Sequence, residues 1–522
     1  MTKRKASESL LSDRVQKARK TGSDGLSDLS DELLLRILGN VSIHSLTCCQ
    51  QVNRRLHDVA GDAQLWKAAY YERFVRPRAS RLPGVLSQPL TPFYLSYSSK
   101  LSKWLSDSHL VNGDTDWKGQ YRLRHNWSRG TCSISEIPVA DGPSVAPVLA
   151  RLRNGIVYTV DRRHGLRAFS CAEKYRLLTS EAIAAHTNNT QPTVLTVEHS
   201  VATGSVQRLA VGFEAGSFAI FCYCRSKVRF TRVYSHAASL DGDLTEMVLA
   251  WPYLSTISQA QTLSLYRFSS SEPGEGEEQM SAPVLLARME SHTVWPPLSL
   301  ALRLIAGNVV LSVAYSKPTM SFGWLAAMQE LTFSEEGEIK DSRIATAANE
   351  GFFQPLSTRT GPRVAGASDV TFAIPTSLSY SHPYLVCSHA DNTLTQYLVT
   401  SSPSALSISP GKRLWGHASA VFSAHVSNRG RAVSVTKCGE EVRLWELEGS
   451  TLTSASDARR KRHPEMSVQV ASGQNAAPFD LKKALSETPS TTRGWVGFDE
   501  EKAVVLREGE HGKQMLVVYD FT

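Results

Sequence analysis

Residues 413–446 read RLWGHASAVFSAHVSNRGRAVSVTKCGEEVRLWE. The stretch alternates short β-prone runs with Asn-Arg-Gly and Cys-Gly, which favour turns. Gly416-His417 stands near its start and Trp445-Glu446 closes it. The pattern predicts strand pairs joined by tight turns, which is typical of an all-β repeat fold.

The order of these residues resembles a WD repeat, in which Gly-His, strands and turns lead to Trp-Asp. Glu446 stands where the family usually has Asp, and Tyr519-Asp520 is a second variant of the same dipeptide. WD repeats use the His to brace a turn, so the resemblance implies that His417 is structural and not a general base. Trp445 is expected to be a second structural residue of the propeller, and Asp391, which lies in a tight turn, a third.

Strand pairs of the same texture recur between Thr131 and Thr522. We expect seven, at 155–170, 208–221, 253–268, 309–333, 384–399, 432–447 and 504–521. A WD blade takes ~40–45 residues, so seven blades fit, and insertions occupy the rest. The sequence therefore predicts a mainly β fold, a WD-repeat-like β-propeller over 131–522 with seven blades, six or eight being the alternatives. Polar insertions are expected near 269–280 and 449–490.

The two ends of this region carry β-prone runs that have no partner nearby. Thr131–Val139 reads TCSISEIPV, and Met515–Tyr519 reads MLVVY. A closed propeller leaves no such edge exposed, and its last blade is commonly completed by a strand from the start of the domain. We therefore expect these two runs to pair.

A helical segment precedes the β region. Residues 26–66 read LSDLSDELLLRILGNVSIHSLTCCQQVNRRLHDVAGDAQLW. Leu29, Leu33, Ile37 and Leu38 fall at helical spacing. Ser30 is expected to cap this helix, and acidic residues in its first turn suit the positive end of the helix dipole. About forty residues bury little core alone, so the segment is expected to lean on something else.

The segment resembles an F-box, the module that docks a protein onto the Skp-type adaptor of a cullin ubiquitin ligase. The matching positions are Leu29, Asp31, Glu32, Leu33, Ile37, Leu38, Leu46, Val52, Leu56, Leu65 and Trp66, whereas Ser30 stands where the family usually has Pro. The resemblance implies adaptor binding by Leu29, Leu33, Leu34, Ile37, Leu38, Leu46 and Val52. An ordinary helical hairpin is the alternative interpretation.

The sequence divides into four parts on this interpretation. A basic N-terminus at 1–25 is expected to be disordered, the F-box to span 26–72, and a linker with a junction helix to span 73–130, before the propeller. The junction segment, Asp116–Gly130, resembles the one that joins F-box and propeller in F-box/WD-repeat proteins. Its expected anchors are Trp117, Tyr121, Leu123 and Trp127; a plain amphipathic helix is the alternative.

Composition narrows the class of protein. The chain has 522 residues, 42% hydrophobic and 20% charged, which is ordinary for a globular protein. No apolar run approaches the ~18–20 residues of a membrane span, and no signal peptide is visible. The chain has eight cysteines and none of them forms a CxxC pair, so neither a metal nor another cofactor is expected. The protein is expected to reside in a reducing compartment. Cys222 and Cys224 are expected to be core thiols.

Basic clusters suggest a location. The first pair of clusters is Lys3, Arg4, Lys5 and Lys17, Arg19, Lys20; a later one is Arg459, Arg460, Lys461, Arg462. They resemble a bipartite and a monopartite nuclear localisation signal. We therefore expect a nuclear protein that can also be present in the cytoplasm. Nucleic-acid binding is not expected, because no aromatic residues are interleaved with these charges.

Over its whole length the chain resembles the F-box/WD-repeat substrate receptors of SCF-type ubiquitin ligases, most closely the fungal ones. This implies a Skp-type adaptor, a cullin held through it, and a protein client that the sequence does not identify. No catalytic motif is present, so no catalytic residue is proposed. A Skp-bound nuclear scaffold without a proteolytic role is the main alternative, and a propeller enzyme is another. Five arginines, Arg151, Arg153, Arg162, Arg163 and Arg167, also raise the hypothesis of a phosphopeptide reader.

Overall fold

The structure is a computed structural model. It describes residues 29–75, 116–142, 147–171, 176–183, 191–198, 206–269, 280–291, 294–305, 307–318, 323–347, 374–402, 405–437, 439–447, 467–470, 494–509 and 512–522. The expected disordered N-terminus, most of the linker, nearly all of both polar insertions and all the basic clusters lie outside these ranges. The described residues form two compact units, a helical unit (29–75 and 116–121) and a β unit (122–522).

The helical unit is built from short helices with short connections. They are α1 (Asp31–Leu38), α2 (Ile43–Cys49), α3 (Arg54–Ala60), α4 (Ala63–Tyr70), the π-helical turn η1 (Tyr71–Val75) and the start of α7 (Trp117–Arg129). The helix predicted at Asp116–Gly130 is therefore confirmed as α7. Its first residues belong to the helical unit and the residues from Arg122 onward to the β unit.

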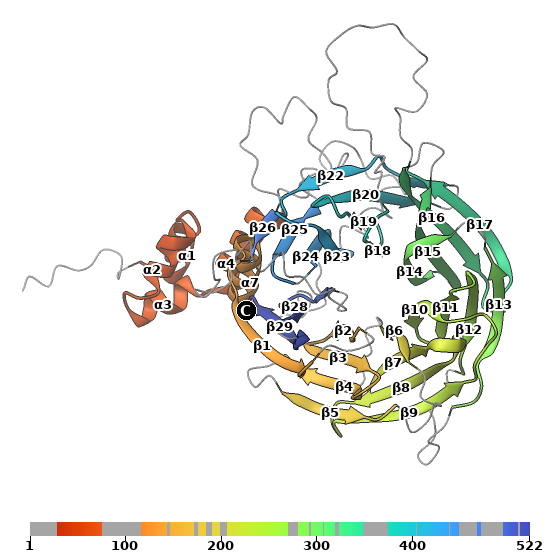
Figure 1. The fold of residues 1–522 in the computed structure, drawn as a ribbon. Coiled ribbons are helices and arrows are strands. Elements are labelled where there is room, and N and C mark those ends of the chain that lie inside the picture. Colours follow the sequence, from red (N-terminus) through yellow and green to blue (C-terminus); the bar gives the residue numbers. More distant parts are fainter. Residues whose placement is uncertain are drawn as a thin grey trace, which may run out of the picture. The chain divides into compact units, whose positions relative to one another are not determined.

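The described strands of the β unit form seven antiparallel sheets arranged as the blades of a propeller, as predicted (Figure 1). The first three blades follow one another along the chain. Their strands are β2 (Leu149–Arg153), β3 (Ile156–Asp161), β4 (Gly165–Ser170) and β5 (Leu177–Glu181); β6 (Pro192–Val197), β7 (Val206–Phe213), β8 (Phe218–Cys224) and β9 (Arg229–His236); and β10 (Leu244–Ala250), β11 (Tyr253–Ser258), β12 (Thr262–Arg267) and β13 (Val284–Glu290).

The next three blades repeat the pattern. Their strands are β14 (Trp295–Ile305), β15 (Asn308–Pro318), β16 (Trp324–Phe333) and β17 (Ile339–Thr346); β18 (Ser377–Ser381), β19 (Tyr384–Ser388), β20 (Thr393–Ser401), β21 (Leu406–Ile408) and β22 (Lys412–Trp415); and β23 (Val421–Val426), β24 (Arg431–Thr436), β25 (Val442–Glu446) and β26 (Ser467–Gln469). In the fifth blade both β21 and β22 pair with β20.

The seventh blade takes strands from both ends of the β unit. It contains β27 (Trp495–Phe498), β28 (Lys502–Glu508), β29 (Gln514–Asp520) and β1 (Ser133–Ala140), which pairs with β29. The register joins Ile134 to Tyr519 and Ile137 to Leu516. The predicted pairing of the two terminal runs is therefore confirmed, and it closes the ring.

The predicted strand pairs are the two middle strands of each blade, and all seven are confirmed. Most residues of these strands are buried, and every residue of β3, β11, β19 and β24 is buried. The first strand of each blade contacts the first strand of the next, from β2 round to β27 and back to β2. Apolar clusters fill the spaces between neighbouring blades.

The β unit has two ends, which we name by what lies there. The turns between the first and second strands, and the links between the third and fourth, lie at the end where α7 packs, because Trp127 and Asn126 contact Glu500 and Phe521 there. We call this the α7 end. The opposite end, called the far end, carries the turns between the second and third strands and the connections from one blade to the next.

Closure by β1 predicts that damage to this strand weakens the whole β unit. Ile137 is 3% exposed and packs in the core between the seventh and first blades. We expect Ile137→Ala to cost about 2–5 kcal/mol, because a buried side chain is lost. Urea unfolding followed by tryptophan fluorescence should show one transition moved to lower urea.

The neighbouring Glu136 provides a matched control, because it lies on the same strand with an exposed side chain. Glu136→Ala should leave the midpoint within about 0.5 kcal/mol of the wild type. A separate early transition in Ile137→Ala, with the main one unmoved, would show that the strand frays alone and does not hold the ring closed.

Candidate functional site

The core of the helical unit is made by one face of its helices. Its most buried side chains are Leu34, Leu38, Leu46, Val59, Ala60, Trp66, Tyr70, Trp117 and Tyr121. The Trp66 indole N–H also donates to the main-chain oxygen of Ala60 at 2.9 Å. Three of the residues predicted to bind the adaptor, Leu34, Leu38 and Leu46, are therefore core residues of this unit, and Leu29 packs partly against them.

The other predicted residues lie on the surface. Leu33 is 49% exposed, Ile37 46% and Val52 68%. Leu33 and Ile37 are one helical turn apart on α1, so their side chains are neighbours. Val41, which the sequence interpretation did not include, is a further exposed apolar residue of this unit. The helical unit thus presents apolar side chains that its own core does not use.

Side-chain caps hold the short helices in place. Ser42 accepts from the Ser45 N–H at 3.1 Å, Asn53 from Leu56 at 2.7 Å and Asp62 from Gln64 at 2.7 Å. The expected cap by Ser30 was wrong: its backbone is at the N-cap position but its side chain makes no cap bond. Its hydroxyl interacts instead with the Glu32 carboxylate, whose pKa is lowered first by the Glu32 main-chain N–H and then by Ser30.

A second anchor of α1 was not predicted. Arg55, on α3, pairs with Asp31 at 2.8 Å. Both side chains are substantially exposed, so the pair adds little stability by itself. It does tie the start of α1 to α3, which helps to fix the orientation of the helix that carries Leu33 and Ile37.

The predicted aromatic anchors of α7 are all buried. Trp117 and Tyr121 belong to the core of the helical unit, where the Tyr121 ring lies edge-on to Trp66 at 5.6 Å. Leu123 and Trp127 belong to a core cluster of the β unit, and the Trp127 ring stacks on Phe521 at 4.0 Å. The helix therefore contributes side chains to both cores.

A cluster of charged side chains next to Trp127 helps to hold this side chain in place. Arg429 pairs with Glu500 at 2.8 Å, Arg431 also pairs with Glu500, and the Arg431 guanidinium lies 5.3 Å from the Trp127 ring centre. Burial alone would raise the pKa of Glu500, but the attraction of Arg431, Arg429 and Arg124 lowers it to about 2. Glu500 is therefore ionised at neutral pH and compensates the arginines around it.

The sixth blade contains a buried polar chain around His417. His417 Nε2 lies 2.6 Å from Ser434 Oγ, its Nδ1 lies 3.3 Å from Glu441, and the Trp445 indole N–H donates to Ser434 at 2.7 Å. Burial lowers the pKa of His417, and Glu441 opposes this shift. This geometry suits a brace inside the blade, and it adds Ser434 and Glu441, which the sequence interpretation missed.

Asp391 lies in the turn of the fifth blade, where the sequence placed it. Its Oδ1 accepts the Thr393 hydroxyl at 2.5 Å, and its Oδ2 pairs with Arg413 at 3.1 Å. Next to it, His389 is 3% exposed and its Nε2 lies 2.8 Å from Thr395 Oγ1. Burial lowers the pKa of His389 to about 4.

The five arginines of the phosphopeptide hypothesis do not form one site. Arg167 is buried and pairs with Asp161 at 2.7 Å. Arg153 ends β2 at the α7 end, whereas Arg162 and Arg163 lie in the turn after β3, at the far end. The hypothesis is wrong for this group because successive antiparallel strands carry its members to opposite ends of the blade.

The cysteines also differ from expectation. Cys222 and Cys224 are both half-buried on β8, and Cys224 Sγ lies 3.1 Å from Ser226 Oγ. Cys222 nevertheless packs against the apolar cluster between the second and third blades, as expected, whereas Cys224 is the last residue of β8 and is half-buried. Within the described residues, no group of three or more His, Cys, Asp or Glu side chains is placed to hold a metal ion.

None of the helices in the described part of the chain has the length and apolarity needed to cross a membrane. The ten basic residues of the expected nuclear localisation signals lie outside the described residues, so the structure assigns them no position.

Comparison with protein families agrees with these two units. Residues 26–72 match the model for F-box-like domains, and residues 132–522 match the model described as the F-box protein pof12 β-propeller. The F-box-like domain places the chain in the class of F-box proteins, which generally bind a Skp1-type adaptor. Because the propeller match covers well over half of the chain, the chain belongs to the F-box protein pof12 β-propeller family.

A fungal relative supports the same assignment. The F-box protein pof12 of Schizosaccharomyces pombe (strain 972 / ATCC 24843) is 27% identical over 150 residues, which is 28% of this chain and 30% of that protein. The match thus spans less than a third of the relative's length. The resemblance to fungal F-box proteins that the sequence suggested is confirmed.

Solved structures give weaker likenesses. Sqt1 of Saccharomyces cerevisiae has a TM-score of 0.38 at 8% identity, covering 74% of this chain and 97% of that one. BamB of Moraxella catarrhalis has a TM-score of 0.35 at 9% identity, covering 74% and 98%. The computationally designed Ika8 protein has a TM-score of 0.34 at 12% identity, covering 72% and 83%.

The buried histidines predict a stability that falls with acid. Folded His389 has a pKa of about 4, below the ~6.5 of an unfolded histidine, so the unfolded chain binds more protons between these values. The free energy of unfolding should therefore drop as pH falls from ~6.5 toward 4, with His389 alone contributing about 2 kcal/mol of the loss by pH 5. Urea unfolding at pH 7.5 and 5 measures it.

His389→Gln keeps a polar group near Thr395 but does not titrate, so its loss between pH 7.5 and 5 should be smaller than that of the wild type. An equal loss in both proteins would mean that His389 is not held neutral by burial.

Proposed function

We propose that this chain is the substrate-recognition subunit of an SCF-type ubiquitin ligase. The F-box would dock on the Skp-type adaptor and, through it, on a cullin, while the propeller would bind a protein client. The observation that carries the proposal is the surface of the helical unit, where Leu33, Ile37 and Val52 are exposed although the unit has a complete core of its own. Leu33 and Ile37 are neighbours on α1, and exposed apolar side chains that lie side by side are typical of a protein interface.

The mechanism would be proximity. A receptor that holds a client near a charged ubiquitin-conjugating enzyme raises the effective concentration of the client's lysines at the reacting thioester. The chain would supply binding and position, and other subunits the chemistry. This agrees with the sequence, which contains none of the catalytic motifs sought, and with a family of generally non-catalytic adaptors.

The far end of the β unit is our candidate for the client surface. The α7 end is partly occupied by Trp127 and the arginine cluster. The far end carries exposed side chains of several kinds, including Arg162, Arg163, Leu240 and Glu440. Loops on a rigid scaffold are where propellers and other repeat folds place recognition residues.

Adaptor docking can be tested on α1. The double variant Leu33→Ala with Ile37→Ala should weaken binding of the purified Skp-type adaptor by at least about tenfold, because each half-exposed side chain contributes about 1 kcal/mol when docking buries it. Isothermal titration calorimetry gives the affinity, and the melting temperature of the double variant should remain near that of the wild type.

Leu34→Ala is the matched control, since Leu34 lies next to Leu33 but is 3% exposed. It should unfold the helical unit more easily, by about 2–5 kcal/mol. If the double variant binds the adaptor with unchanged affinity, the proposal that Leu33 and Ile37 form the docking surface is wrong. Co-purification from cells separates the wider roles: adaptor with cullin supports the ligase, adaptor without cullin supports a scaffold, and neither supports a propeller protein of another kind.

We also propose that the chain is nuclear. Replacing Lys3, Arg4, Lys5, Lys17, Arg19 and Lys20 with Ala should move a fluorescent fusion toward the cytoplasm, because importins read such basic runs. The nuclear-to-cytoplasmic ratio in living cells measures the effect. A shift that needs Arg459–Arg462 to be changed as well would assign the signal to the later cluster, and an unchanged ratio with both sets replaced would refute the proposal.

A further inference from the structure

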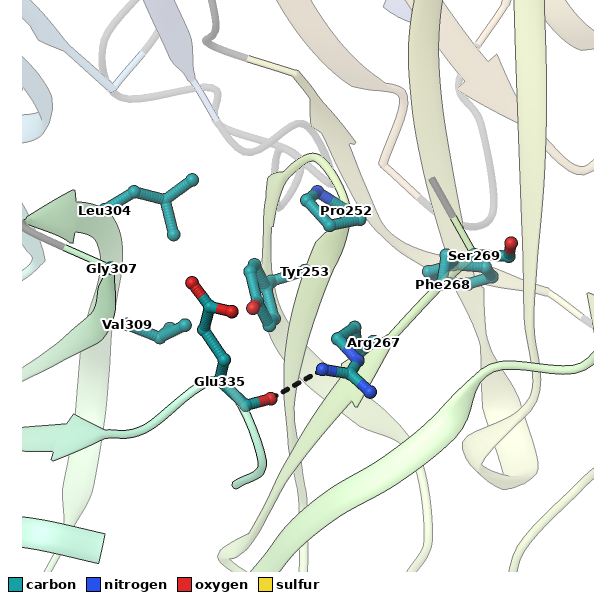
Figure 2. Close-up of a pocket in the computed structure, with 9 residues that line it drawn as sticks. All are labelled: Pro252, Tyr253, Arg267, Phe268, Ser269, Leu304, Gly307, Val309 and Glu335. Carbon is teal, nitrogen blue, oxygen red and sulfur yellow. Dashed lines mark hydrogen bonds between the residues drawn. The ribbon is translucent and has the colours of Figure 1, made fainter. Parts of the chain in front are cut away.

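The junction of the third and fourth blades holds a cleft at the α7 end that the proposed function does not use. Its volume is about 480 Å³. The lining residues come from the turns and strand ends of both blades and include Tyr253, Arg267, Leu304, Val309 and Glu335 (Figure 2). This volume is in the range of sites that take a small ligand or one or two side chains.

Apolar side chains are exposed around this cleft. We call Val284, Leu285, Leu304, Ile305 and Ile339 the apolar rim; each is between 48% and 56% exposed. They lie at the α7 ends of strands from both blades: Leu304 and Ile305 end β14, Val284 and Leu285 begin β13, and Ile339 begins β17. Val284 pairs with Arg267, which lines the cleft, and Ile339 pairs with Phe333, which in turn pairs with Val309 of the lining.

The two blades are in contact at this point. The Arg267 guanidinium donates to the main-chain oxygen of Glu335 at 2.7 Å. A Cβ added to Gly337, which has a φ of +94°, would lie 2.9 Å from the Leu286 Cβ, so the turn after β16 packs closely on β13. The cleft is therefore bounded by fixed backbone on both sides, which makes it a preformed site.

The cleft contains a carboxylate, that of Glu335, among mainly apolar lining residues. Figure 2 shows the Glu335 carboxylate directed toward the space between Tyr253 and Leu304, away from the main-chain oxygen that Arg267 binds. Among the described residues, no Lys, Arg or His forms an ion pair with this carboxylate. Glu336 and Glu338, also exposed, belong to the same turn. A carboxylate in such a place favours a cation as its partner and repels phosphate.

Arg267 adds a second point of recognition. One of its N–H groups is used by the Glu335 main-chain oxygen, and a guanidinium has five such donors in a planar fork. Because Arg267 lines the cleft, its remaining donors can bind the carbonyl oxygen of an extended peptide that lies there. The cleft thus offers an apolar wall, a carboxylate for a basic side chain and a donor for a peptide backbone.

We propose that this cleft binds a short extended protein segment in which Lys or Arg stands next to a large apolar residue. The apolar residue covers Leu304 and its neighbours on the apolar rim, and the basic side chain reaches Glu335. The site lies at the α7 end and the candidate client surface at the far end, so it is a second docking site, and it stands or falls independently of the ligase proposal.

The test is a positional-scanning library of nine-residue peptides on the immobilised full-length protein. The library should select Lys or Arg at one position and Leu or Phe beside it. For a fluorescein-labelled peptide of the selected sequence, Glu335→Gln should weaken binding about fivefold or more in fluorescence anisotropy, and Leu304→Ser by a similar factor, since each removes one part of the recognition.

Glu338→Gln is the matched control, because it removes the same charge from the same turn without lining the cleft, and it should change affinity less than twofold. Glu335→Gln keeps the main-chain oxygen that Arg267 binds, and equal melting temperatures will show that the variants are folded. Selection of no basic residue, equal loss in the Glu335 and Glu338 variants, or no loss in either cleft variant would each overturn the proposal.

Discussion

The pairing of β1 with β29 is the contact on which the β unit depends. Each apolar cluster of the propeller lies between two neighbouring blades, so no blade has a complete core by itself. The cluster between the seventh and first blades forms only because β1 stands in the seventh blade, where Ile137 and Val139 pack with Val504 and Leu516. Without this pairing, β29 would expose an edge and two blades would lose a shared core.

Much of the propeller could be predicted because its middle strands are buried on both faces. Such strands appear in a sequence as compact apolar runs around a turn, as in 208–221, and all seven were found this way. The first and fourth strands were harder to recognise. β2 reads LARLR and its residues are mostly half-buried, because it lies next to the central axis. β13 reads VLLARME and four of its seven residues are exposed, because it lies at the perimeter. In neither strand do apolar and polar residues alternate over the whole length, and this alternation is the pattern that identifies a strand.

The adaptor-docking residues could be predicted as a group but not separated. Leu33, Leu34, Ile37 and Leu38 all have helical spacing, and a short helix with two apolar stripes does not reveal which stripe faces the core. The fold decides it by placing Leu34 and Leu38 against Trp66 and Tyr70. The brace around His417 had a similar limit: Ser434 and Glu441 follow the histidine by 17 and 24 residues, and only the folding of β23, β24 and β25 into one sheet brings them to it.

The pairing of β1 with β29 also has a consequence for folding during synthesis, because the two strands are made at very different times. About 370 residues separate Ala140 from Gln514, which at 5–20 residues per second means that β1 is made on the order of 20–75 s before its partner. Throughout that interval β1 is a β-prone segment with an unsatisfied edge. Its Pro138, which lacks an N–H, and its exposed Glu136 are features that discourage pairing with a wrong strand. A nascent chain of this protein is thus expected to need shielding of its first strand until its last one is made.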